Sequence, residues 1–228
     1  INWPLDDKGE PSNRLELITS ANGIAHENAH DALADVTALI AVTKLIKQKQ
    51  PQLYDYLLKM RDKKLVQRLV NVDDKKPFVY ASGRYDNEFA KTTVAFPLTT
   101  SRNGGVVVYD LRYDPTPFVE LDTNELATKI FASWEERQAE DFVKLPVKEL
   151  QYNRCPAVAP LGVLEQGDGW QKISLDAETI QKHQNILLKH PDFAEKLRSI
   201  FENKPAFKKL PDPEAQLYDG FLNDRDRL

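Results

Sequence analysis

The stretch TTVAFPLTTSRNGGVVVYDLR (residues 92–112) decides the fold. It holds two short runs rich in β-branched and aromatic residues, which favour strands, on either side of the turn-forming SRNGG (101–105). A run of similar composition, KPFVYASG (76–83), precedes it. The sequence therefore predicts consecutive antiparallel strands, with the second and third joined by a hairpin turn at 101–105.

Before about residue 71, apolar residues recur instead at helical spacing. RLELITSANG (14–23) predicts a short helix that ends at Asn22-Gly23, where glycine suits the left-handed cap. A second helix is expected from Asn28, as its N-cap, to about Lys49. A third is expected over 50–70, with four side chains facing inward: Leu53, Leu57, Met60 and Leu65.

Helices and strands also follow the hairpin. DTNELATKIFASWEERQ (122–138) predicts a helix capped by Asp122 or Thr123, and LPVKELQYNRCPAVAP (145–160) predicts one or two strands. Residues 174–203 predict two helices broken at His190-Pro191, before a proline-rich linker. The expected fold class is α+β, with a small, strongly bent antiparallel sheet over 77–158 that is flanked by helices.

The amino-acid composition limits the class of protein to which this chain can belong. The chain has 228 residues, 41% apolar and 29% charged, as soluble globular proteins do, and no apolar run is long enough to span a membrane. Its polar opening, INWPLDDKGEPSN (1–13), is no signal peptide, so we expect a cytoplasmic protein. It lacks an initiator Met, and we expect it to be a piece of something longer.

Charge and cysteine content narrow the sites that are possible. The net charge of −4 provides no global attraction to nucleic acid, so a nucleic-acid surface would have to be a local basic patch. The single Cys155 excludes an internal disulfide and a cysteine-based zinc site. We expect Cys155 to be a buried strand residue, and Trp134 and Trp170 to belong to the core.

The segment IAHENAHDALAD (24–35) fits two catalytic patterns at once. His26 to His30 fit H-E-x-x-H, in which two histidines on one helix bind zinc and the glutamate is the general base. However, one predicted helix ends at Gly23 and the next begins near Asn28, which leaves His26 in the connection. No glutamate occurs from 28 to 87 to act as a third ligand, so the zinc-protease hypothesis is disfavoured.

The second pattern, H-D-A-x-x-D, runs from His30 to Asp35 and is typical of 3′→5′ exonucleases. Such enzymes use two divalent ions to generate hydroxide and to stabilise the leaving oxygen. Asp35, one turn into a helix, could bind one ion, and Mg²⁺ prefers such oxygen ligands. His30, at or just before the helix start, could deprotonate the attacking water. The simpler alternative is that the segment from His30 to Asp35 belongs to a capped amphipathic helix whose Asp and His side chains face solvent.

The surrounding sequence resembles the bacterial exodeoxyribonuclease I family along its whole length. The shared pieces are NWP (2–4), RLE (14–16), ANGI (21–24), NAHDA (28–32), ADV (34–36), QPQLYDYL (50–57), LPVK (145–148), NRCP (153–156) and EAQLYDGFLNDRDR (214–227). The resemblance implies a clamp around single-stranded DNA made from an RNase-H-like exonuclease domain, an SH3-like domain and a helical C-terminal domain. Residues 1–50 would then end the exonuclease domain, 51–203 form the SH3-like domain with helical additions, and 204–228 open the third part.

The family's Asp-x-Glu motif on an opening strand has no counterpart here. Three Asp-x-Glu matches begin at Asp86, Asp176 and Asp212, but none follows a predicted strand in the right domain. The chain therefore offers the candidate base and one metal-binding carboxylate where the family uses four carboxylates. We expect it to be inactive alone.

Candidate binding residues complete the prediction. Cations that could contact DNA phosphates are Arg61, Lys64, Lys76 and Arg102. The resemblance also implies that Tyr56 helps to bind the acidic C-terminal tail of the single-stranded DNA-binding protein. Pro160, Glu165 and Leu188 depart from that family pocket.

The expected function is part of a Mg²⁺-dependent 3′→5′ exonuclease for single-stranded DNA, a monomer serving DNA repair and recombination. The alternative is an SH3-like module that binds single-stranded DNA or a protein tail without catalysis.

Overall fold

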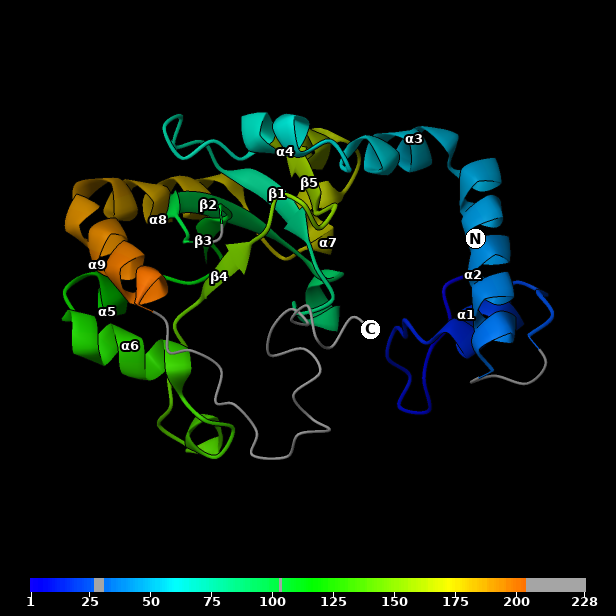
Figure 1. The fold of residues 1–228 in the computed structure, drawn as a ribbon, viewed down its shortest axis with the longest axis horizontal. Helices are drawn as coiled ribbons and strands as arrows, with labels where there is room; N and C mark the ends of the chain where they lie inside the picture. Colours follow the sequence, from blue (N-terminus) through cyan, green and yellow to red (C-terminus); the bar gives the residue numbers. More distant parts are fainter. Residues whose placement is uncertain (27–30, 103, 204–228) are drawn as a thin grey trace, which may run out of the picture.

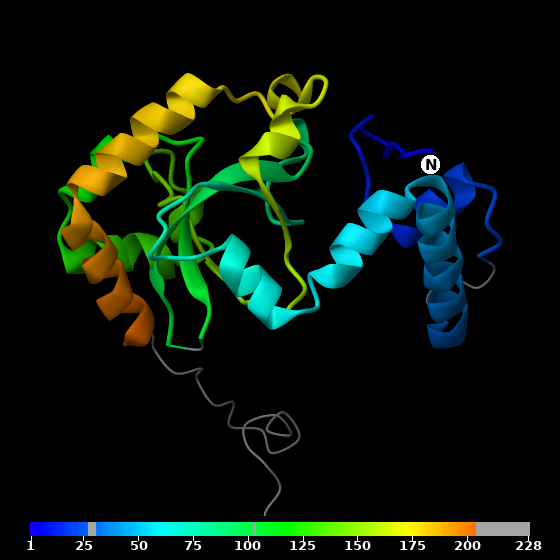
Figure 2. The ribbon, with the colours of Figure 1, turned by 90° about the horizontal axis from the view of Figure 1, so that it is seen from above.

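The computed structural model describes residues 1–26, 31–102 and 104–203. Two bodies are visible in Figures 1 and 2: a small helical body from the N-terminal part, and a larger body built on the sheet. The small body contains α1 (Leu15–Ala21) and α2 (Ala32–Lys49). Helix α3 (Pro51–Lys59) leads from it to α4 (Lys63–Leu69), which lies against the larger body. None of the described helices is both long and apolar enough to cross a bilayer.

The N-terminal helices begin and end at identifiable residues. Helix α1 ends at Asn22-Gly23 as predicted, and Gly23 has a φ of 65°. The N-cap of α2 is Asp31, not Asn28, because the Asp31 carboxylate accepts the backbone N–H groups of Leu33 and Ala34. The prediction of Asn28 was therefore wrong by three positions.

The predicted third helix is two helices. Pro51 occupies the first turn of α3, a position where its missing N–H costs nothing. The Asp62 side chain accepts the N–H groups of Lys64 and Leu65 and starts α4 as a separate element. Met60 is buried at the junction, but Leu53 and Leu57 are exposed, so only part of the predicted inward face is confirmed.

The sheet has five antiparallel strands in the order β4-β3-β2-β1-β5. These are β1 (Phe78–Ala81), β2 (Thr92–Thr100), β3 (Val106–Asp110), β4 (Val147–Leu150) and β5 (Ala157–Pro160). Strands β2 and β3 form the predicted hairpin, with Phe96 opposite Tyr109. Their register shifts between Pro97 and Thr99, and a bulge of this kind bends a strand. The antiparallel prediction is confirmed.

Helices and short 3-10 turns connect and flank the strands. They are η1 (Asn87–Phe89), α5 (Thr116–Val119), α6 (Thr123–Phe131), η2 (Glu136–Gln138), η3 (Leu161–Glu165), α7 (Gly169–Lys172), α8 (Ala177–Lys189) and α9 (Pro191–Glu202). Asp122 caps α6 in a reciprocal capping box with Glu125, as the sequence indicates. Pro191 separates α8 from α9 at the predicted place.

Two apolar clusters hold the larger body together. One includes Phe96 and Tyr109 of the sheet with Phe193 and Leu197 of α9. The other includes Phe78 and Val108 with Met60 and with Val66 of α4. Neighbouring residues of one strand, such as Val108 and Tyr109, belong to opposite clusters, because successive side chains point to opposite faces. The sheet is therefore packed on both faces.

Two predictions about individual residues were wrong. Trp134 is 72% exposed in the segment after α6, not part of the core. Cys155 is exposed and has a φ of 45°, because it lies in the turn between β4 and β5 and not in a strand. Trp170 is partly buried and packs against the first apolar cluster, as predicted.

Candidate nucleic-acid interface

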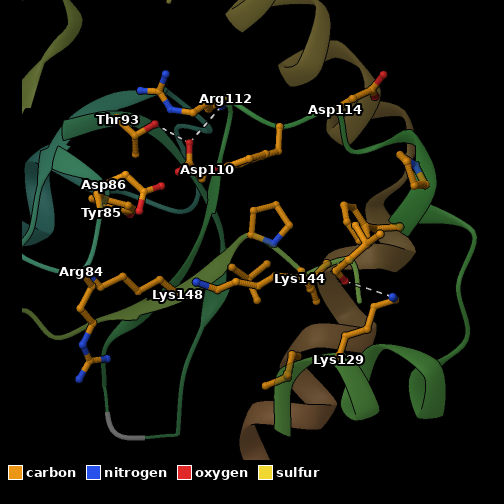
Figure 3. Close-up of a pocket in the computed structure, with 18 of the residues that line it drawn as sticks. Arg84, Tyr85, Asp86, Thr93, Asp110, Arg112, Asp114, Lys129, Lys144 and Lys148 are labelled. Atoms are coloured by element: carbon orange, nitrogen blue, oxygen red, sulfur yellow. Dashed lines mark hydrogen bonds between the residues drawn. The ribbon is translucent and has the colours of Figure 1, made fainter. Parts of the chain in front are cut away.

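A cleft of about 640 Å³ opens beside the sheet, between the loop after β1, the end of β3, helices α5 and α6, and the segment that leads into β4. Figure 3 shows its walls. Six cationic residues line it: Arg84, Arg112, Lys129, Arg137, Lys144 and Lys148. Aromatic residues lie between them, among which Tyr113 is 43% exposed. Cations interleaved with aromatic rings are what a single-stranded nucleic acid requires of a binding groove.

One of these cations has a structural role. The Arg112 guanidinium lies 3.5 Å from the centre of the Phe89 ring. It donates hydrogen bonds to the carbonyl oxygens of Ile173, at 2.7 Å, and Thr92, at 3.1 Å. These contacts connect β2 to the segment after α7. Arg112 therefore fixes the wall of the cleft, and both of its terminal nitrogens already donate to backbone carbonyl oxygens.

Asp110 is a buried acid at the back of the cleft. Its carboxylate accepts the hydroxyl of Thr93 and the backbone N–H of Arg112. Burial raises the pKa of Asp110, although these hydrogen bonds oppose the shift. The carboxylate is thus held by its own neighbours and is hardly accessible to an incoming cation.

Lys148 is a half-buried cation of the cleft. Its Nζ lies 4.5 Å from the centre of the Tyr80 ring and 4.8 Å from that of Tyr85. The ammonium donates a hydrogen bond to the Ser82 hydroxyl. Burial, aided by the charges of Arg84 and Lys144, lowers the pKa of Lys148 to about 8.

Two further cations stand near α6. Lys129 Nζ donates to the carbonyl oxygen of Val143 at 3.2 Å and lies 5.8 Å from the centre of the Phe142 ring. Arg137 donates to the carbonyl oxygen of Ile130. Each guanidinium or ammonium keeps donors beyond those in these contacts, so the cleft presents positive charge along its α6 side.

The four cations predicted from sequence lie elsewhere. Arg61 and Lys64 are exposed at the start of α4, Lys76 precedes β1, and Arg102 is in the β2–β3 turn. The structure brings none of them into the cleft, whose lining residues do not include them. The cleft cations were missed because they come from four separated segments: the loop after β1, the end of β3, the α6 region and the segment into β4. The LPVK (145–148) likeness was the one signal that could have identified Lys148.

The H-D-A-x-x-D segment is only partly described. His30 lies outside the described residues, directly before the N-cap Asp31. Asp35 is in the first turn of α2, as predicted. Its Oδ1 lies 2.9 Å from His26 Nε2, while His26 Nδ1 lies 3.4 Å from the Thr19 hydroxyl. The His26 side chain is almost fully buried and connects α1 to α2.

This arrangement does not favour the zinc-protease hypothesis. His26 lies outside any helix, and α2 begins only at Ala32. No group of three or more His, Cys, Asp or Glu residues in the described part of the chain could hold a metal ion. His26 therefore has a structural role in the described contacts.

Tyr56 lies on α3, half-buried against the second apolar cluster. Its hydroxyl donates a 2.8 Å hydrogen bond to the carbonyl oxygen of Val158 on β5. The contact connects α3 to the edge strand of the sheet.

The curled five-stranded antiparallel sheet and its helical additions define an SH3-like domain. The chain belongs to the exonuclease I family, because the family described as "Exonuclease I SH3-like domain" matches residues 61–203. Exodeoxyribonuclease I of Escherichia coli (strain K12) is 37% identical over the whole chain, and that of Haemophilus influenzae is 35% identical. The chain spans about half the length of these curated relatives, 48% of each.

Solved structures agree with this assignment. A crystal structure of E. coli exonuclease I with a dA16 oligonucleotide matches the whole chain with a TM-score of 0.86 at 37% identity, over 48% of its own chain. A zinc-bound form of an E. coli exonuclease I complex with single-stranded DNA matches with a TM-score of 0.84. A structure named as SSB/exonuclease I with an inhibitor matches with a TM-score of 0.80. The α+β fold with an SH3-like sheet is therefore confirmed.

Proposed function

We propose that this chain is part of an enzyme that degrades single-stranded DNA from its 3′ end, and that its SH3-like domain holds the strand. The observation that carries the proposal is the whole-chain match to exodeoxyribonuclease I. Two matching structures of that enzyme contain DNA, as their names state. The cleft cations and rings support a role of the same kind for this chain, because they suit phosphates and bases.

In the proposed reaction His30 is the general base and Asp35 a metal-binding carboxylate. The position of Asp35 in the first turn of α2, with its side chain partly accessible, supports this proposal. The described residues do not form a magnesium site by themselves. At the start of α2 they offer the Asp35 carboxylate with His26 beside it, and they contain no group of three or more metal-binding side chains. Mg²⁺ as the cofactor therefore remains a proposal for a longer protein, supported by the relative that binds a metal ion.

The proposal has further parts. The protein would act as a monomer in the cytoplasm, in DNA repair and recombination, and its partner would be the tail of the single-stranded DNA-binding protein. The SSB/exonuclease I structure supports the choice of partner. Tyr56 is proposed to contact that tail, and Arg61, Lys64, Lys76 and Arg102 to contact DNA outside the cleft.

A binding module without catalysis is the second candidate. The lack of a metal-binding group among the described residues favours it for this chain in isolation. In that case the cleft binds single-stranded DNA or an acidic protein tail, and the chain catalyses no reaction.

The test is single-turnover degradation of a 3′-labelled oligonucleotide by the longer enzyme that the proposal implies. His30→Ala should lower the rate by roughly 10²–10⁴-fold, the usual contribution of a general base. Asp35→Ala should cost at least as much, since it removes a metal ligand. DNA affinity without metal should change little in His30→Ala, because cations carry most of the binding.

The control is Asp31→Asn, which keeps a side chain that can cap α2 and leaves His30 and Asp35 in place. Its rate should stay near that of the wild type. A His30→Ala rate within about twofold of the wild type would show that His30 is not the base.

A further inference from the structure

The imidazole ring of His26 is held at both of its nitrogens between α1 and α2. Its Nε2 lies 2.9 Å from Asp35 Oδ1, and its Nδ1 lies 3.4 Å from the Thr19 hydroxyl oxygen. The His26 side chain is 5% exposed and Thr19 is 1% exposed, whereas the Asp35 side chain is 43% exposed. A buried ring therefore contacts a carboxylate whose side chain still reaches solvent.

The turn after α1 places this ring. Gly23 has a φ of 65°, and the N–H of Ile24 donates to the carbonyl oxygen of Thr19 at 2.9 Å. The chain thus turns back at the end of α1, and His26 comes to lie against the Thr19 side chain. Asp35 approaches from the other direction, on the first turn of α2. The backbone on both sides of the contact is therefore restrained.

The direction of the hydrogen bond follows from the two groups. A carboxylate only accepts hydrogen bonds, so His26 Nε2 carries the hydrogen in the contact with Asp35. The Thr19 hydroxyl oxygen also lies 3.0 Å from the carbonyl oxygen of Leu15 and 2.9 Å from that of Glu16, which holds it to α1. Asp35 therefore receives an N–H from a ring that is itself restrained.

The packing of α1 against α2 does not by itself require this polar pair. Ile18 of α1 and Ala38 and Val42 of α2 are buried, and the two helices contact each other (Figure 1). Burial of an imidazole ring costs desolvation free energy, which its hydrogen bonds must offset. What the Nε2–H adds is a fixed orientation for Asp35, whose side chain would otherwise choose among several rotamers.

We propose that His26 is a positioning residue: its Nε2–H holds the Asp35 carboxylate in the orientation that binds a divalent ion, and Thr19 holds the ring. The inference rests on the proposed function, in which Asp35 is a metal-binding carboxylate. Carboxylate oxygens suit Mg²⁺ and Mn²⁺, so the chemistry of the Asp35 side chain fits such an ion. A hydrogen bond to a ligating carboxylate orients it, and loss of the donor typically lowers metal affinity by roughly 10–100-fold.

The experiment titrates Mn²⁺ alone, without DNA, into the metal-free form of the longer enzyme that the proposed function implies, and measures free Mn²⁺ by electron paramagnetic resonance. His26→Asn should weaken Mn²⁺ binding by roughly 10–100-fold, because the asparagine amide takes the place of Nδ1 and does not reach Asp35. His26→Gln should recover most of that loss, because its amide nitrogen takes the place of Nε2 and can donate to the carboxylate.

His183→Gln is the matched control for the loss of a buried histidine. His183 on α8 is buried, and its Nδ1 lies 2.7 Å from the carbonyl oxygen of Leu111. Its replacement should lower the thermal unfolding temperature and leave Mn²⁺ affinity unchanged. A role of His26 in stability alone would make the two histidine variants behave alike, so the metal titration separates positioning from stability.

The Mg²⁺ dependence of single-turnover DNA degradation gives a second measurement. In His26→Asn the half-saturating Mg²⁺ concentration should rise by roughly tenfold or more, while the rate at saturating Mg²⁺ falls far less. DNA affinity in EDTA should stay at the wild-type value, because the contact between His26 and Asp35 is remote from the cleft residues.

The tautomer of His26 can be measured in the 228-residue chain itself, without metal. Nitrogen-15 NMR of the imidazole should show the hydrogen on Nε2, as the contact with Asp35 requires. A hydrogen on Nδ1 alone would contradict the proposal, because Nε2 could not then donate to the carboxylate.

The outcomes separate the two proposals. Wild-type Mn²⁺ affinity in His26→Asn, together with weak binding in Asp35→Ala, would overturn the positioning role and leave the proposed function intact. Equal losses in His26→Asn and His26→Gln would also overturn it, because the nitrogen that faces Asp35 would then be irrelevant. Wild-type Mn²⁺ affinity in Asp35→Ala would overturn both, since Asp35 would not be a metal ligand.

Thr19→Val keeps the test decisive if His26→Asn does not fold. Valine preserves the shape of the side chain and removes the hydroxyl that faces Nδ1. The less restrained ring should weaken Mn²⁺ binding by roughly three- to tenfold, less than loss of the ring itself. Unchanged Mn²⁺ affinity in a folded Thr19→Val enzyme would mean that Thr19 does not hold the ring for this purpose, and the proposal would fail.

Discussion

The Tyr109 hydroxyl is an exception to the pairing of buried polar atoms in this fold. Tyr109 is fully buried on β3, and its hydroxyl has no hydrogen-bond partner among the described residues. An unsatisfied buried hydroxyl costs about 1–3 kcal/mol. Tyr109→Phe should therefore keep the packing with Phe193 and raise the free energy of unfolding by about 1 kcal/mol, measured by urea denaturation.

Tyr152→Phe is the control for this prediction. The Tyr152 hydroxyl donates to the carbonyl oxygen of Val70, and losing that bond should cost about 1 kcal/mol. If Tyr109→Phe destabilised the protein as much as Tyr152→Phe, the Tyr109 hydroxyl would have a partner in solution.

Single residues were predictable from sequence where local chemistry decides them. Asp122 caps α6 and Gly23 follows α1 because each acts on the few residues beside it. Cys155 and Trp134 were not predictable in this way. A strand-like composition around Cys155 does not reveal the left-handed turn that exposes it, and a tryptophan side chain is usually buried.

Among the elements, the β2–β3 hairpin depends on a close approach at Gly105. A Cβ at this position would lie 2.5 Å from the carbonyl oxygen of Leu150 on β4, which is backbone and cannot rotate away. Gly105→Ala should therefore cost about 1–3 kcal/mol of unfolding free energy by displacing β4. Thermal and urea unfolding measure this loss.

Gly162→Ala is the matched control, because nothing lies within 4 Å of a Cβ there and its φ is not positive. Its stability should stay within about 0.5 kcal/mol of the wild type, as for most surface substitutions. Equal stability of the two variants would mean that β4 moves freely relative to the hairpin.

Helix α2 shows the limit of periodicity as a guide to burial. The spacing correctly predicts a helix, yet Leu33, Val36 and Ile40 are exposed, and Ala38 and Val42 are buried instead. Periodicity identifies an apolar stripe but not the element that covers it. In the described part of the chain, α1 contacts α2, and the stripe of Leu33, Val36 and Ile40 stays exposed.

At the scale of the molecule, the sheet could be predicted from sequence but the cleft could not. The runs rich in β-branched and aromatic residues, together with the SRNGG turn, specify the antiparallel order of β1 to β3. The cleft requires Arg84, Lys129 and Lys148 to line one cavity, and their positions depend on how tightly the sheet curls and where α6 packs. Those are long-range consequences of packing, which local propensity does not contain.

The proposed separation of DNA binding from hydrolysis leads to a last prediction, for the chain of residues 1–228 in the presence of Mg²⁺. It should bind a labelled single strand but release no nucleotide. Hydrolysis through two divalent ions needs several carboxylates around one phosphate, and the described residues contain no group of three metal-binding side chains. Binding needs only the cleft, which is complete among them. The measurement is nucleotide release in Mg²⁺ over hours, with anisotropy in EDTA confirming that the strand is bound. Release that Asp35→Ala abolishes would mean that residues 1–228 hold a working metal site, and the separation of binding from catalysis would fail.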